Sequence, residues 1–184
     1  MPESILELME TGVYLITSSF GGQDSGMIVT WLSPASLTRT HPRIVTALSP
    51  KNRTTELIQK SRRFVVHLLS RAQFEYVALF GLYSSRDVNK FRDLHVTRSP
   101  GGMPILEGTC GWLECTIIAE VELGDRFLYV AEITAKGAVS TSDTPLQLND
   151  AFSRLPKDVV QALDQKHNKD MLRDEDLVKR FPQS

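Results

Sequence analysis

The chain has 184 residues, enough for one domain with a sizeable core. Its formal net charge of −1, with 23% charged residues, offers no surplus of cations for binding nucleic acid. The apolar stretches are far shorter than the roughly 20 residues that a membrane helix needs. Residues 1–8 carry acids where a secretion signal carries cations. We therefore expect a cytoplasmic protein that binds neither nucleic acid nor a membrane.

Short strands are predicted along most of the chain. Residues 12–18, 27–32, 43–48 and 63–69 are rich in β-branched and aromatic residues and are bounded by Gly, Pro, Ser and Asn. Residues 111–121 and 127–135 alternate between two faces on either side of a turn at Gly124-Asp125, which predicts a long hairpin. A domain with this many strands usually closes into a barrel or sandwich.

Helices are expected between the strands and at the end of the chain. Residues 54–61 follow Asn52, a good N-cap, and residues 72–80 place apolar side chains at helical spacing. Beyond residue 148 we expect one helix around residues 159–163 and another at 174–180, with Pro182 just past its end. We expect a mainly β domain at residues 1–147 with helical insertions, and a helical C-terminal extension at 148–184 packed on the same domain.

The cysteine and histidine residues do not predict a metal site. Cys110 and Cys115 are five residues apart in a strand-like segment, which would put them on opposite faces of a sheet as small apolar residues. The histidines are scattered without the spacing of a zinc or iron site.

Two neighbouring segments could form a site. Residues 49–57 leave a strand and enter a helix, and they bring cations, hydroxyl groups and free backbone N–H groups together, as a phosphate requires. The alternative is an ordinary N-cap with solvated cations, and the residues alone leave both readings open. Residues 27–33 form a strand with a polar end whose backbone could bind a flat heteroaromatic ring. The alternative there is a core strand with one Trp.

Segments in consistent order over residues 8–140 resemble motifs of the flavin reductase-like family of FMN-binding split β-barrels, which includes NAD(P)H:flavin oxidoreductases and flavoredoxin. They are the strand segments 12–17 (GVYLIT), 26–33 (GMIVTWLS) and 64–69 (FVVHLL), the strand, loop and helix at 43–58, the segments 87–91 (DVNKF) and 112–115 (WLEC), and the hairpin at 124–133 (GDRFLYVAEI).

The resemblance implies a Greek-key-type split barrel that binds FMN, or alternatively FAD, and that works as a homodimer with flavin near the subunit interface. It implies contacts to the ring and ribityl chain from Val29, Thr30, Trp31 and Ser33. It implies that the phosphate is held by Ser49, Lys51, Asn52, Arg53 and Thr54. Lys90 and Phe91 would approach from a neighbouring loop, with the flavin of the partner subunit as an expected contact.

The chain departs from the family pattern at three places. Arg126 stands where the family has a histidine tied to use of the nicotinamide donor, Ala131 replaces a glycine, and His41-Pro42 replaces a Pro-Pro pair. Arg126 is therefore our one candidate catalytic residue. The alternative is that Arg126 is a solvated residue of the hairpin without a catalytic role. We expect an NAD(P)H-dependent flavin reductase. The alternatives are an FMN electron carrier that receives electrons from a partner protein, and a flavin-free barrel that serves as a binding module.

Overall fold

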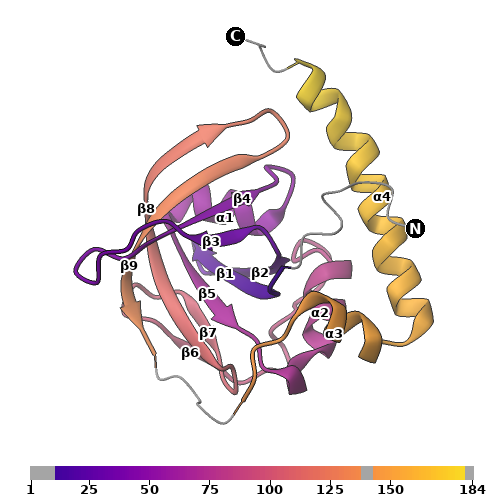
Figure 1. Cartoon of the computed structure of the whole chain (residues 1–184), viewed down its shortest axis with the longest axis horizontal. Helices are drawn as coiled ribbons and strands as arrows, with labels where there is room; N and C mark the ends of the chain where they lie inside the picture. The colour runs from indigo at the N-terminus through magenta and orange to yellow at the C-terminus, as the bar shows by residue number, and fades with distance from the viewer. Residues whose placement is uncertain (1–10, 138–142, 181–184) are drawn as a thin grey trace.

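The computed structural model describes residues 11–137 and 143–180. Seven strands form one antiparallel sheet in the order β2-β1-β5-β8-β9-β4-β3, and two short strands form a second sheet (Figure 1). The strands of the large sheet are β1 (Tyr14–Phe20), β2 (Gln23–Val29), β3 (Leu32–Pro34), β4 (Arg43–Leu48), β5 (Arg63–Leu68), β8 (Gly111–Glu122) and β9 (Phe127–Lys136); the small sheet has β6 (Val96–Arg98) and β7 (Pro104–Leu106).

The large sheet curls into a barrel with a seam between its first and last strands. β2 and β3 lie at opposite edges of the sheet, yet only Thr30 and Trp31 separate them in the chain. The three Cα–Cα steps from Val29 to Leu32 span at most about 11 Å, so the two edges must come close together. The Thr46 hydroxyl and the Ala47 N–H both donate to the Trp31 carbonyl, at 2.8 and 3.3 Å, which extends the β3–β4 pairing up to this junction. The expected split barrel is confirmed.

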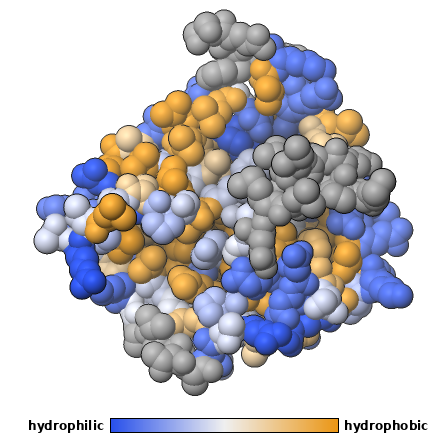
Figure 2. All heavy atoms as spheres, viewed as in Figure 1, coloured by the Kyte–Doolittle hydropathy of each residue, from blue (hydrophilic) through white to orange (hydrophobic). Residues whose placement is uncertain are grey.

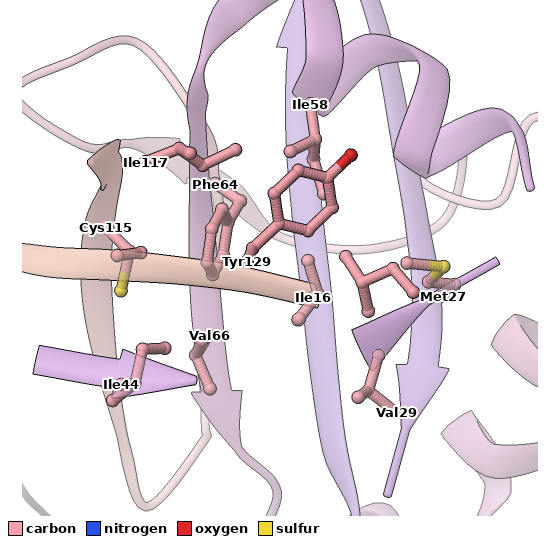
Figure 3. Close-up of a cluster of buried hydrophobic side chains, with 12 residues drawn as sticks. Ile16, Met27, Val29, Ile44, Ile58, Phe64, Val66, Cys115, Ile117 and Tyr129 are labelled. Carbon is pink, nitrogen blue, oxygen red and sulfur yellow. The ribbon is translucent and has the colours of Figure 1, made fainter. Parts of the chain in front are cut away.

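Both faces of the central strands are buried. On β1, Ile16 points into the barrel and Leu15 points outward, and both are fully buried. The interior cluster joins strands that are far apart in sequence (Figure 3): Ile16, Met27, Val29, Ile44, Leu48, Ile58, Phe64, Val66, Cys115, Ile117, Tyr129 and Ala131. The outer cluster includes Val13, Leu15, Leu69, Val77, Phe80, Leu106, Leu146, Ala151 and Leu155. Burial on both faces explains the strands' nearly continuous apolar sequence.

The helices cover the barrel at different places. α1 (Arg53–Ser61) packs on β1 and β2 and contributes Ile58 to the interior cluster; it ends at Arg62, whose left-handed backbone (φ 59°) lets its N–H bond to the Ile58 carbonyl. A 3₁₀ turn (Arg71–Gln73) precedes α2 (Glu75–Leu82), which packs on β2. α3 (Leu148–Arg154) and α4 (Lys157–Arg180) follow the last strand.

The expected pair of C-terminal helices at 159–163 and 174–180 is wrong, because α4 is one helix of 24 residues. No Gly or Pro interrupts residues 157–180, and ion pairs at i,i+4, such as Lys166–Asp170, support the polar middle, where apolar periodicity is weak. Pro182 lies outside the described residues. No helix in the described part of the chain is long and apolar enough to cross a membrane.

The two cysteines are free and buried, but they do not share a strand as expected. Cys110 lies in a bend just before β8, because β8 begins at Gly111. Cys115 lies in the interior cluster, where burial raises the pKa of its thiol to about 12, with a further contribution from Glu114. Such a thiol is protonated near neutral pH and acts as an apolar residue.

Candidate functional site

A cavity of about 270 Å³ lies at the barrel seam. Its walls come from the end of β2, the end of β4, the turn into α1, the β8–β9 turn and α4. The lining residues are Met27, Ile28, Val29, Thr30, Trp31, Ala47, Leu48, Ser49, Asn52, Arg126, Lys166, His167, Asp170, Arg173 and Asp174. Segments distant in sequence meet here because closing the sheet brings β2 next to β3 and β4.

The seam leaves backbone donors without partners. Among the described residues, no hydrogen bond uses the N–H of Thr30 or of Trp31. Both residues lie between strands, where the sheet ladder is interrupted by closure, and Trp31 is 55% exposed. A ligand with a carbonyl-bearing, flat edge fits these donors and the Trp31 ring.

The start of α1 offers a second set of donors at the same cavity. Asn52 has the extended backbone of an N-cap, but its side chain makes no capping bond, and its Nδ2 lies 3.4 Å from Met27 Sδ. Within the described residues, the N–H groups of Arg53, Thr54 and Thr55 have no acceptor. Free first-turn amides and the dipole of α1 favour an anion. The Ser49 hydroxyl, which accepts a bond from the Lys51 N–H at 3.3 Å, lies on the same wall.

Three of the residues expected at the phosphate do not line this cavity. Lys51 is exposed in the turn. Arg53 donates to Glu56 at 2.7 Å and also bonds to Gln23, so its charge is already paired. Thr54 is buried, and its hydroxyl bonds to that of Ser25 at 2.8 Å.

Arg53 instead lines a second cavity, of about 570 Å³. Its lining residues are Gly22, Gln23, Asp24, Arg53, Ser85, Arg86, Asp87, Val88 and Asn89. Arg53 and Arg86 both pair with Glu56. Desolvation opposes ionisation of Glu56, but the two guanidinium groups outweigh it and lower the pKa of this carboxyl. Since Asn52 lines the first cavity and Arg53 the second, both cavities border the start of α1.

Ser33, Lys90 and Phe91 also lie outside both cavities. Ser33 is exposed in β3. Lys90 is 4% exposed, and its Nζ donates to the Gly26 carbonyl at 3.0 Å and to the Phe80 carbonyl at 3.2 Å. Burial, with a smaller contribution from Lys166, lowers the pKa of Lys90 to about 8. Phe91 packs edge-on against Phe80, with ring centroids 5.6 Å apart.

Arg126 lines the seam cavity, and its side chain is 22% exposed. Its guanidinium lies over the Trp31 ring, 5.5 Å from the centroid, and donates to Asp174 Oδ2 at 2.6 Å. Asp174 also accepts a bond from Arg173 at 2.7 Å. Desolvation would raise the pKa of Asp174, but the bonds from Arg173 and Arg126 outweigh it and hold the pKa below its ordinary value.

The α4 wall is the part of the site that the sequence did not predict. Lys166, His167, Asp170, Arg173 and Asp174 all line the cavity, and their spacing places them on one face of the helix. The charge spacing at 166, 170 and 174 was visible in the sequence, but it is equally typical of a solvated face.

The profile described as "Flavin reductase like domain" matches residues 6–156. A flavin reductase of Pseudomonas putida is 30% identical over 132 residues, covering 71% of this chain and 74% of the relative. The high molecular weight rubredoxin of Moorella thermoacetica is 27% identical over 136 residues, covering 73% of this chain; the chain spans 58% of that relative's length. The solved structure of the styrene monooxygenase flavin reductase from Pseudomonas putida S12 superposes with a TM-score of 0.65 at 28% identity, covering 77% and 88% of the two chains.

Proposed function

Since the chain belongs to the flavin reductase-like domain family and is an oxidoreductase, we propose that it binds FMN at the seam cavity and reduces it with NAD(P)H. The observation that carries this proposal is the convergence of two unpaired donor sets on one cavity. The seam offers the amides of Thr30 and Trp31, and the start of α1 offers further amides beside Ser49 and Asn52. One set suits a carbonyl-bearing ring and the other suits a phosphate.

In this proposal each wall has a role. Val29, Thr30 and Trp31 hold the ring and its polar edge, while Ser49, Asn52 and the α1 amides hold the phosphate. Lys51, which forms no ion pair among the described residues, adds long-range attraction, whereas Arg53 is occupied by Glu56. Flavin contacts of Ser33, Thr54, Lys90 and Phe91 stay predictions that rest on the family resemblance.

A bound flavin would supply the redox chemistry, as the cofactor does in flavoproteins generally. The protein's own residues bind the ring, orient it and exclude water. Arg126 presents a fixed cation above Trp31, and an arginine holds its proton at any physiological pH. We propose that Arg126 acts as an anchor for anionic groups of the bound nucleotides and not as a proton carrier.

FAD is a second candidate cofactor. The second cavity, which is the larger of the two, would offer room for the additional nucleotide of FAD. A dinucleotide whose first phosphate bound at the start of α1 would extend past Arg53 toward Arg86. Both guanidinium groups would have to share their charge between Glu56 and the second phosphate. Affinities of FMN and FAD measured side by side would decide between the two cofactors.

We also propose a homodimer. Trp31 is 55% exposed at the cavity, and β8 exposes Ile118 and Val121 by 47% and 51%. Figure 2 shows apolar residues gathered in patches on one face of the molecule. Such surface in a soluble protein is often covered by a partner. We propose cytoplasmic residence and, from the name of the styrene monooxygenase flavin reductase, an electron-accepting partner protein as well.

The deciding experiment is an absorbance spectrum of the purified protein with FMN, recorded without oxygen before and after adding NADH or NADPH. We expect a bound-flavin band that bleaches with one of the two donors. A band that bleaches with dithionite but with neither nucleotide would favour the electron carrier. A protein that takes up no FMN would be the flavin-free binding module.

A further inference from the structure

The helix α4 adds a wall that the family domain does not include. The family match ends at residue 156, and α4 begins at Lys157. Its first turns are anchored by apolar contacts: Val159, Val160 and Leu163 pack on the outer cluster, and the Leu163 methyl group fills the space beside Gly81 of α2. From this anchor the helix runs along the side of the barrel (Figure 1).

The next turns of α4 line the seam cavity with a chain of ion pairs. Lys166 and Arg173 both bind Asp170, at 2.6 and 2.8 Å. Arg173 also binds Asp174, at 2.7 Å, and Asp174 binds Arg126 at 2.6 Å. Only the last of these pairs joins α4 to the barrel, since Arg126 lies in the β8–β9 turn and the other members all lie on α4.

The burial of Asp174 shows how closely this contact is packed. Its side chain is 5% exposed, and Arg126 is held between it and the Trp31 ring. Arg126 also lies 3.3 Å from Asp125 in its own turn, and Asp174 pairs with Arg173 on its own helix, so among these ion pairs the Asp174–Arg126 contact is the one that joins α4 to the β8–β9 turn. Asp174 is therefore placed to fix both the guanidinium of Arg126 and the position of α4.

The volume of the seam cavity is close to that of a small cofactor pocket. About 270 Å³ lies just below the roughly 300–1,000 Å³ of typical cofactor pockets. A flavin ring at this seam would lie between the barrel and the α4 wall, on the side where Asp174 contacts Arg126.

We propose that α4 is a latch over the flavin ring, held shut by Asp174 acting through Arg126, so that this chain retains one flavin as a bound prosthetic group. The inference rests on the proposed binding of flavin at the seam. It makes Asp174 a positioning residue that controls the rate of flavin exchange.

The test compares Asp174→Asn with Asp176→Asn, which removes the same charge from an exposed position of the same helix. FMN release after dilution is followed by the rise in flavin fluorescence, and thermal melts establish that each variant is folded. We expect Asp174→Asn to release FMN at least about tenfold faster, and Asp176→Asn to match the wild type. Arg126→Gln should also be fast, and the double variant should be no faster than the faster single variant, because both changes break one contact.

Hydrogen exchange supplies a readout that needs no flavin. In Asp174→Asn, residues 166–178 should exchange faster while residues 159–163, anchored on α2, keep their protection. If the wild type binds FMN and Asp174→Asn releases it as slowly as the wild type does, the latch is refuted and the flavin site stands. If the wild type binds no flavin, the proposed function fails and the latch with it.

Discussion

The histidine near the end of β5 makes the stability of this protein depend on pH. His67 is fully buried between β1 and β7. Its Nδ1–H donates to the Leu15 carbonyl at 3.1 Å, and its Nε2 accepts a bond from the Leu106 N–H at 3.1 Å. These partners require the neutral ring, because a protonated Nε2 would point a second donor at the Leu106 N–H. Burial lowers the pKa of His67 to about 4, and the bond to Leu15 opposes the shift only in part.

The magnitude follows from the difference between the folded and unfolded pKa. The unfolded chain binds a proton near the ordinary pKa of 6.5, and the folded protein near 4. The stability that neutral His67 contributes is therefore present above pH 6.5 and is lost as pH falls toward 4. Proton linkage gives a loss of about 2.5 kcal/mol between pH 7 and pH 4.5, out of about 3.4 kcal/mol for the whole shift.

Urea unfolding at pH 7 and pH 4.5 measures this loss, with His67→Gln as the test variant. The variant is less stable at both pH values, but its loss on acidification should be smaller than that of the wild type by about 2.5 kcal/mol. His95→Gln, at an exposed histidine, controls for removal of an imidazole and should behave as the wild type. Carboxyl groups with lowered pKa, such as Asp174, titrate in all three proteins and cancel. Equal losses in the wild type and His67→Gln would refute the reasoning.

Two further predictions concern the site and its support. Asn52→Asp keeps a good N-cap but puts a negative charge at the expected phosphate, so FMN should bind at least about tenfold more weakly while riboflavin changes little. Asn149→Asp in α3 is the charge-matched control, and equal losses for both flavins in Asn52→Asp would contradict the phosphate site. Gly26→Ala would place a Cβ 2.8 Å from the Phe80 ring, so thermal unfolding should show a loss of about 1–3 kcal/mol. Gly81→Ala is the control: its Cβ would meet only a flexible methyl group of Leu163 at 3.0 Å, so it should lower the stability less. An unchanged melting temperature for Gly26→Ala would show that the Phe80 ring can move aside and would contradict the prediction.

Local patterns in the sequence determined most of the fold. Alternation over residues 111–121 and 127–135 predicted the hairpin of β8 and β9, and the turn residues at 49–52 predicted the start of α1. The order of the family motifs predicted the split barrel, which is confirmed. These features depend on neighbours within a few residues, and the sequence displays such neighbours directly. The continuity of α4 was missed because its middle is supported by ion pairs, which leave little apolar periodicity.

Only the tertiary structure decided how the expected site residues divide. Closure of the sheet places Val29, Thr30 and Trp31 beside Ser49 and Asn52, whereas Glu56 holds Arg53 at the second cavity. Lys90 is buried between β2 and α2, where its Nζ donates to the Gly26 and Phe80 carbonyl groups. The pairing of Arg126 with Asp174 joins positions 48 residues apart, and it exists only because α4 packs on α2 and passes over the seam. Contacts of this kind depend on how elements pack in space, and no local pattern in the sequence records that packing.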